Sequence, residues 1–231
     1  MCGRFTLTVP PDELLRELGL EPVSHFAPRY NVAPQQPVLA IAASGSGELR
    51  TGTLQWGLVP WWAEDPRIGS RMINARGESL GSKPAFREAF DRRRCLVVAD
   101  GFYEWRKQPG GKVPMRFTRR GGEPLTFAAL WERWKPPEGP TLHTCTIVTT
   151  RANESMAPIH DRMPVIIDAA DRRRWLDPAA NGEAVGDLLR PCAEDALTGY
   201  DVSTRVNNVA NDDDGCIEPH TPSPPEQRSL L

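Results

Sequence analysis

Cys2 directly follows the initiator methionine, and this position predicts an unusual reactivity. Aminopeptidases that remove initiator methionines accept small second residues, so their action would leave Cys2 with a free α-amine beside its thiol. An α-amine titrates near ~8, compared with ~10.4 for lysine, so far more of it is neutral at pH 7. A neutral amine attacks aldehydes to form a Schiff base, and the thiol can then close on the imine carbon as a thiazolidine. The alternative for this residue alone is an inert, buried cysteine.

Three further segments place polar or ionisable groups beside apolar runs: 73–76, 99–105 and 159–164. Each has an ordinary explanation when taken singly. The Asn-x-Arg of the first segment is compatible with a helix cap. A glutamate between aromatics commonly faces outward from a half-buried strand, and a histidine before an aspartate is commonly a surface pair. The chemistry therefore depends on whether these segments meet in the fold.

The elements that must position these residues are mainly strands. Apolar runs bounded by Gly, Pro and polar residues predict strands at 38–43, 49–56, 95–99, 102–106, 115–118, 126–131, 143–149 and 163–167. Helices are expected at 11–18, 169–175 and 184–189. Because the helices do not alternate regularly with the strands, we predict an α+β fold with a mainly antiparallel, barrel-like β-sheet core and short flanking helices. One domain is expected over 1–210, followed by a flexible C-terminal tail over 211–231.

Composition excludes several classes of protein. The chain has 231 residues, and 39% of them are hydrophobic, which is enough for a sizeable core. No apolar run is long enough to span a membrane, and no basic segment leads into an apolar one, so we expect a cytoplasmic protein. The net charge of -2 does not by itself indicate nucleic acid. Five cysteines without a C-x-x-C pair argue against structural zinc and favour a reducing compartment.

Together, seven ordered blocks resemble the SRAP family, the abasic-site processing proteins also called SOS-response-associated peptidases. The blocks are 1–5, 29–34, 56–62, 73–76, 99–105, 159–164 and, in two short pieces, 202–203 with 206–208. They cover nearly the whole chain up to about residue 210. Gly77 departs from the pattern, since a larger residue is expected there, but it bears no proposed catalytic group.

The resemblance implies the SRAP fold and a covalent crosslink to abasic sites in single-stranded DNA through Cys2, which would shield such sites during the DNA damage response. The open form of the abasic sugar is an aldehyde, the electrophile that an aminothiol prefers. By resemblance, Asn74 would orient the opened sugar. Glu104 would be the general acid/base, with a pKa raised by burial beside aromatics, and His160 would move protons and assist reversal. No cofactor and no metal is expected.

The resemblance also implies a DNA-binding surface. The side chains expected to contact DNA are those of Arg4, Trp61, Trp62, Arg76, Thr149 and Arg162. The arginines suit phosphates, and the two tryptophans would form a platform or wedge against bases, with core packing as their alternative. We expect a monomer that has no membrane partner, binds single-stranded DNA containing abasic sites, and associates with the nucleoid on damaged DNA.

Two other functions remain open from the same residues. Cys2, His160 and Glu104 could form the thiol–imidazole–carboxylate set of a peptidase, which would include removal of Met1 by the protein itself. A non-covalent module for single-stranded DNA would use only the arginines and aromatics. If a Schiff base does form, it also permits β-elimination, so an abasic-site lyase activity is a further expectation.

Overall fold

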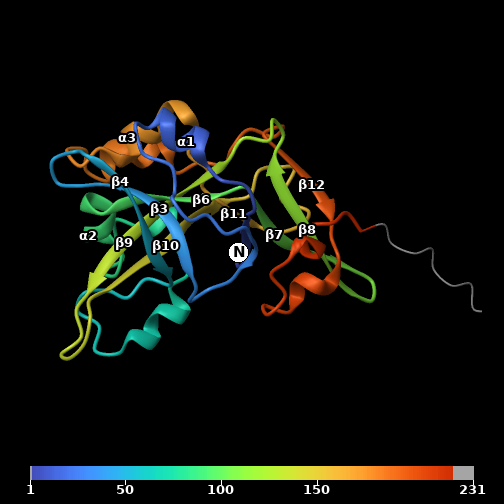
Figure 1. The fold of residues 1–231 in the computed structure, drawn as a ribbon, viewed down its shortest axis with the longest axis horizontal. Coiled ribbons are helices and arrows are strands. Elements are labelled where there is room, and N and C mark those ends of the chain that lie inside the picture. Colours follow the sequence, from blue (N-terminus) through green and yellow to red (C-terminus); the bar gives the residue numbers. More distant parts are fainter. Residues whose placement is uncertain (1, 221–231) are drawn as a thin grey trace, which may run out of the picture.

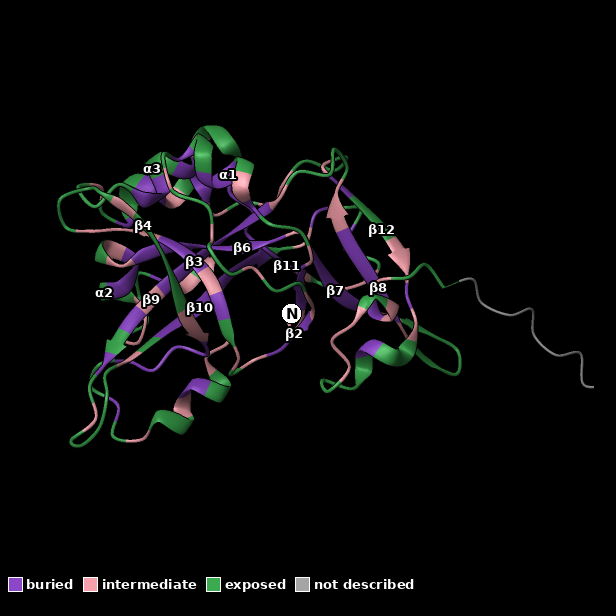
Figure 2. Ribbon diagram, in the orientation of Figure 1, coloured by how far each residue is buried: buried purple, intermediate pink, exposed green. Residues whose placement is uncertain are grey.

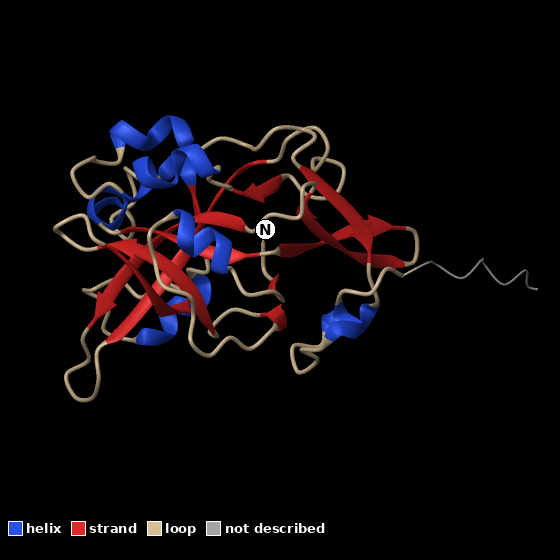
Figure 3. Cartoon of the chain, turned by 45° about the horizontal axis from the view of Figure 1, so that its top comes forward, coloured by secondary structure: helices blue, strands red, loops and turns tan. Residues whose placement is uncertain are grey.

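The computed structural model describes residues 2–220 of the 231-residue chain. Strands dominate it, and the helices are short and lie around them (Figure 3). The strands are β1 (Phe5–Leu7), β2 (Arg29–Val32), β3 (Pro37–Ala43), β4 (Leu49–Trp56), β5 (Asn74–Arg76), β6 (Arg94–Ala99), β7 (Gly101–Gln108), β8 (Gly111–Arg119), β9 (Leu125–Trp134), β10 (Leu142–Arg151), β11 (Arg162–Pro164) and β12 (Leu197–Asp201). The α-helices are α1 (Asp12–Glu17), α2 (Arg87–Arg92) and α3 (Arg172–Leu176).

Five strands close into a barrel in the order β10, β4, β3, β6, β9 and back to β10. The short strands β5 and β11 add to β10. Only the β10–β4 and β10–β5 pairs are parallel within the described part of the chain. β6 is buried along its whole length, as Figure 2 shows. The predicted α+β fold with a mainly antiparallel, barrel-like core is therefore confirmed.

A second sheet holds the start of the chain against the barrel. Its strand order is β12–β8–β7–β1–β2, and Phe5 of β1 pairs with Phe102 of β7. In Figure 1, β7, β8 and β12 lie on one side, the barrel lies on the other, and the blue N-terminal segment runs between them. A largely buried carboxylate stabilises this junction, because Asp100 accepts hydrogen bonds from Thr6 Oγ1 and from Arg116 at 3.0 Å. The residues before β1 therefore lie where the two sheets meet.

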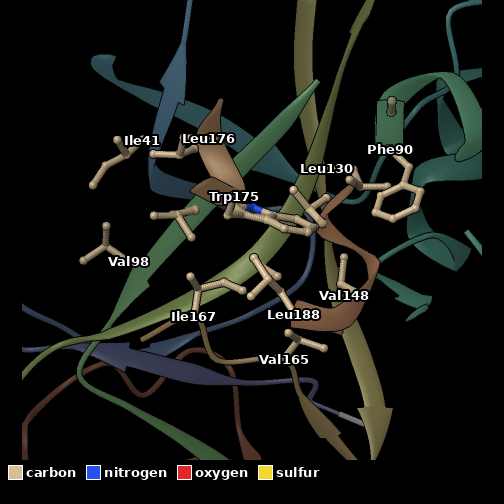
Figure 4. Packing of buried hydrophobic residues seen from close by; sticks show 14 of the residues in the cluster. Ile41, Phe90, Val98, Leu130, Val148, Val165, Ile167, Trp175, Leu176 and Leu188 are labelled. Carbon is tan, nitrogen blue, oxygen red and sulfur yellow. The ribbon is translucent and has the colours of Figure 1, made fainter. Parts of the chain in front are cut away.

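Of four apolar clusters among the described residues, the two largest contain most of the buried apolar side chains. The larger lies between the barrel and the helices, with Trp175 at its centre among Leu130, Ile167 and Leu188 (Figure 4). Trp175 Nε1 donates to the Cys95 carbonyl at 2.9 Å, which ties α3 to β6. The smaller cluster contains Cys2 together with the rings of Phe5, Trp56, Phe102 and Phe127.

The helical turns and short strands differ most from expectation. Segment 184–189, predicted as an α-helix, forms the 3₁₀ helix η4 (Glu183–Leu188), and the predicted strand at 163–167 ends as β11 at Pro164. Strands β1, β2, β5 and β12 and helix α2 were not predicted. The remaining 3₁₀ helices are η1 (Pro66–Arg71), η2 (Gly77–Ser79), η3 (Ala169–Asp171), η5 (Thr204–Asn207) and η6 (Asp214–Cys216).

The expected tail begins later than its composition predicts. Residues 211–220 pack on β2, since Asp212 accepts from the backbone N–H groups of Tyr30 and Asn31 at 2.5 and 2.9 Å and pairs with Arg29 at 2.5 Å. Cys216 in η6 is buried. The acidic run looks like solvated chain in the sequence, but the carboxylates of Asp212 and Asp213 accept from donors elsewhere in the fold. The rest of the expected tail, 221–231, lies outside the described residues.

Candidate active site

Cys2 lies at the junction of the two sheets and is fully buried. The pairing of β1 with β7 continues one residue toward it, because the Tyr103 N–H donates to the Arg4 carbonyl at 3.0 Å. Burial first, and then the negative charge of Glu104, raise the pKa of the Cys2 thiol well above its ordinary range. The sulfur is therefore a neutral thiol at pH 7, and a nearby base must take its proton before it can act as a nucleophile.

Asn74 holds the backbone of Cys2. It begins β5, which pairs in parallel with β10. Its Nδ2 donates to the Cys2 carbonyl at 2.8 Å. Its Oδ1 is buried and has no hydrogen-bond partner among the described residues. Because a buried acceptor without a partner is costly, this oxygen is suited to receive a donor from a bound molecule beside Cys2.

Glu104 supplies a buried carboxyl group to the same place. It lies on β7, and 3% of its surface is exposed. Burial raises its pKa above the ordinary value, although the charge of His160 acts in the opposite direction. A carboxyl group with a raised pKa exchanges protons near neutral pH more readily than an exposed glutamate, so it is suited to act as a general acid/base.

His160 lies in the turn before β11. Its Nδ1 accepts the Arg162 backbone N–H at 2.9 Å and lies 2.9 Å from Asp161 Oδ1. The neutral ring can accept from Arg162, whereas the protonated ring can donate to Asp161. The predicted set of Cys2, Asn74, Glu104 and His160 is thus brought to one junction, although its members come from segments far apart in the sequence.

A second group of predicted residues surrounds the end of β10. Arg162 donates to the Thr149 carbonyl at 2.6 Å and forms a two-point ion pair with Glu78, with N–O distances of 2.7 and 2.9 Å. Arg76 is opposite Thr149 in the β5–β10 register. The Arg76 side chain is exposed and has no ion pair or side-chain hydrogen bond within the described ranges. Arg76 is therefore available for an external anion, whereas Arg162 already holds a carboxylate.

Arg4 is committed to contacts inside the protein. Its guanidinium donates to Asn31 Oδ1 at 2.8 Å and to the Val206 carbonyl at 2.7 Å. Asn31 in turn donates to the carbonyls of Val206, Asn208 and Asn211. These bonds tie the residues around Cys2 to β2 and η5. Asn31 lies in one of the seven blocks, but its residue type alone indicated no role. The assignment of Arg4 to phosphate contact stays a prediction.

The two predicted tryptophans are on the surface. The exposed fractions of Trp61 and Trp62 are 60% and 47%, so their core-packing alternative is wrong. Their loop follows β4 at Gly57, where φ is +132° and an added Cβ would lie 2.6 Å from the Gly69 carbonyl oxygen. Trp56 Nε1 donates to the Ile73 carbonyl at 2.7 Å. The tryptophan loop is thereby attached to the segment that carries Asn74.

Two features are absent from the described part of the chain. No cluster of three or more His, Cys, Asp or Glu side chains in that part could hold a metal ion. Within 2–220, no helix has both the length and the apolar character needed to cross a membrane.

Comparison with known proteins identifies the family. The sequence model described as "SOS response associated peptidase (SRAP)" matches residues 1–209. The chain belongs to the SRAP family. The family resemblance drawn from the seven blocks is therefore confirmed. Gly77 departs from the family pattern at a position with room for a side chain. An added Cβ there would lie 3.4 Å from both Leu189 Cβ and the Thr149 carbonyl oxygen, which is an ordinary contact.

The SRAP relatives cover most of the chain. It is 44% identical over 225 residues to the abasic site processing protein YoqW of Bacillus subtilis, covering 95% of this chain and all of that protein. It is 30% identical to the abasic site processing protein HMCES of Xenopus tropicalis, covering 94% of this chain and 78% of that one. A crystal structure of a Bacteroides thetaiotaomicron protein superposes with a TM-score of 0.85 at 22% identity, over 95% of this chain and all of that chain, and supports the fold alone.

Proposed function

We propose that this protein processes abasic sites in single-stranded DNA by forming a covalent thiazolidine crosslink through Cys2 after removal of Met1. The observation that carries the proposal is the hydrogen bond from Asn74 to the Cys2 carbonyl, which holds the reacting residue beside a buried carboxyl group. The names of the SRAP relatives, abasic site processing proteins, support the choice of substrate.

The proposed reaction has two bond-forming steps. Hydrolysis of the Met1–Cys2 bond consumes one water, releases free methionine and creates the α-amine of Cys2. This amine attacks the aldehyde carbon of the opened sugar, and loss of water then leaves an imine. The thiol next adds to the imine carbon, forming a C–S bond while the imine nitrogen gains a proton. The sum is one aminothiol and one aldehyde giving one thiazolidine and one water. No oxidant or reductant is consumed.

Each residue of the site has a role in this sequence. The unpartnered Oδ1 of Asn74 accepts a hydrogen bond from a hydroxyl group of the opened sugar. Protonated Glu104 donates to the leaving oxygen, and its carboxylate form accepts the thiol proton at closure, which is needed because the pKa of Cys2 is raised. His160 exchanges protons at the imine and assists the reverse reaction. An abasic-site lyase activity would follow if the imine loses its neighbouring carbon-bound proton instead.

Exposed arginine and tryptophan side chains of this fold suit single-stranded DNA. Arg76 is exposed at the end of β5, and Arg162 lies across β10 from it. The exposed rings of Trp61 and Trp62 offer faces on which bases of any sequence can stack. Thr149 lies between the two arginine-bearing strands. A monomer that associates with the nucleoid on damaged DNA is part of this proposal.

A thiol peptidase is the second candidate, because the matching family model carries the word peptidase. Its nucleophile would have to be a thiolate, which requires a lowered pKa. In this site burial and Glu104 both raise the pKa of Cys2. The electrostatics therefore favour chemistry that starts at the amine. Removal of Met1 by the protein itself is the peptidase activity retained in the proposal, and it would require a neighbouring base to take the thiol proton of Cys2.

Blocking the α-amine tests the proposed function. We expect Met-free protein to form a heat-stable adduct with single-stranded DNA that carries one abasic site. Protein with a non-cleavable extension before Cys2 should form none, because the amine is then part of a peptide bond. The measurement is a denaturing gel of the adduct, with intact mass establishing whether Met1 is present. Extended protein that crosslinks as well as Met-free protein would exclude the thiazolidine, and a retained cleavage of peptides would favour the peptidase.

A single arginine tests the DNA surface. Arg76→Ala should weaken binding to undamaged single-stranded DNA about threefold to tenfold and reduce the slope of log K against log salt by about 0.7, because one phosphate contact is lost. Arg50→Ala is the matched control, since it removes the same charge from an exposed arginine on β4. Binding is measured by fluorescence anisotropy across a salt series. An equal loss in both variants, or equal affinity of wild-type protein for intact duplex, would contradict the proposed surface.

A further inference from the structure

Glu78 occupies the anion-binding end of Arg162. Its two carboxylate oxygens lie 2.7 and 2.9 Å from the two terminal nitrogens of the guanidinium. This two-point geometry is the one that arginine also forms with a phosphate group. The carboxylate thus takes the position that a DNA phosphate would need in order to bind Arg162 through the same nitrogens.

The fold brings Glu78 close to the site. Glu78 is the middle residue of η2, the single turn that follows β5 and packs on β10. The turn begins at Gly77, where an added Cβ would lie 3.4 Å from the Thr149 carbonyl oxygen. That same carbonyl accepts from Arg162 at 2.6 Å. Arg162 is therefore held by β10 on one side and by the carboxylate on the other.

The two partners differ in how easily they can separate. The Arg162 side chain is 13% exposed, whereas the Glu78 side chain is 50% exposed. A guanidinium left without an anion at this depth would be costly, but a half-exposed carboxylate regains water when it moves away. The Nε–H of Arg162 is also buried without an acceptor among the described residues. Arg162 consequently needs an anion at all times, and the carboxylate is the one that can leave.

We propose that Glu78 is an internal substitute for a DNA phosphate, which neutralises Arg162 in the free protein and is displaced when single-stranded DNA binds. This inference rests on the proposed function. The exchange lowers the affinity for undamaged single-stranded DNA, because binding must first break an ion pair. Non-covalent contacts then hold the protein only weakly, and durable attachment requires the reaction at Cys2. The hydrogen bonds with Arg162 are also the main cause of the lowered pKa of Glu78, in agreement with a close ion pair in the free protein.

Neutralising Glu78 tests the exchange. Glu78→Gln should bind an undamaged single-stranded oligonucleotide about threefold to tenfold more tightly than wild type at low salt. The slope of log K against log salt should become steeper by up to about 0.7, because in wild type the displaced carboxylate takes up a salt cation and offsets the counterion released from the phosphate, whereas the glutamine variant has no such uptake. Glu48→Gln is the matched control: it removes the same charge from an exposed carboxylate paired with an arginine, and its effect should be smaller than about twofold.

Two further measurements separate the possible outcomes. Glu78→Ala should also tighten binding, whereas a residue that merely positions Arg162 would weaken binding in both variants; thermal unfolding establishes that each variant is folded. At saturating abasic DNA the crosslinking rate of Glu78→Gln should equal that of wild type. Affinity that is unchanged or weaker in Glu78→Gln and Glu78→Ala overturns the exchange while wild-type crosslinking still supports the proposed function. Wild-type protein that binds no single-stranded DNA overturns both.

Discussion

Met-free protein carrying Cys2→Ala is expected to lose the durable adduct with abasic single-stranded DNA by at least about 10²-fold. Alanine keeps the α-amine, so an imine still forms, but no thiol is present to close the ring. Ring closure within one residue benefits from an effective molarity on the order of 10⁵ M or more, and this contribution disappears with the sulfur. The measurement is the fraction of adduct that survives heating without reductant.

Two comparisons make the loss specific. Borohydride should still trap the imine of Cys2→Ala, which shows that the variant binds DNA and presents its amine. Cys192→Ala is the control, because Cys192 is a partly exposed cysteine on another part of the chain, and it should crosslink like wild type. The thiazolidine is ruled out if Cys2→Ala gives as much heat-stable adduct as wild type without reductant.

The barrel follows from local patterns in the sequence. The apolar run of β6 has the composition that burial on a sheet requires, and the glycine-rich turn between β3 and β4 marks those two strands, although β4 is largely exposed. The periodicity does not reveal β1, because three residues are too few to show an alternation. β12 is hidden for another reason: Gly199 interrupts it, and an added Cβ there would lie 2.4 Å from the ring of Phe117. Such close packing between strands depends on the partner and cannot be inferred from one segment.

The candidate site was predictable only in part. The blocks around Cys2, Asn74, Glu104 and His160 are visible in the sequence through the family resemblance. The contacts that decide their chemistry join distant positions, such as the bond from Asn74 to Cys2 and the one from Arg4 to Asn31. Composition also misassigned the segment around Asp212, because an acidic run has the same appearance whether water or backbone N–H groups solvate it. The features that could not be predicted are therefore contacts between residues far apart in the sequence.

Glu104→Gln is expected to slow crosslinking by about 10²-fold, the usual loss when a general acid/base is removed. The amide has nearly the same shape as the protonated carboxyl group but does not titrate, so binding to undamaged single-stranded DNA should hardly change. Glu132→Gln is the matched control. Glu132 is also a buried glutamate whose pKa is raised by burial, but it lies on β9 and pairs with Arg93. It should crosslink at the wild-type rate.

The pH dependence of the crosslinking rate provides an independent test of the role of Glu104. Burial raises the pKa of Glu104, so its acid form persists to higher pH than that of an exposed glutamate. The wild-type rate should be bell-shaped in pH, because the reaction needs both the neutral α-amine and the protonated form of Glu104. In Glu104→Gln the fall on the alkaline side should be absent.

The stability of the folded protein should also depend on the ionisation of Glu104. Burial disfavours the charged form, so wild type should lose stability relative to Glu104→Gln as pH rises from the ordinary glutamate pKa through the raised pKa of Glu104.

His160→Gln should act on a different step. The proposed role of wild-type His160 is proton exchange at the imine. We therefore expect the substitution to slow adduct formation modestly and to slow reversal of the finished crosslink by about 10-fold or more. The measurement is a time course of adduct formation, followed by transfer of the adduct to excess fresh abasic DNA. Wild-type rates of formation and release in both Glu104→Gln and His160→Gln, with DNA binding intact, would remove these two residues from the mechanism. We expect Glu104→Gln to impair formation and His160→Gln to impair reversal. This result would assign the two proton transfers to separate residues, Glu104 on β7 and His160 before β11.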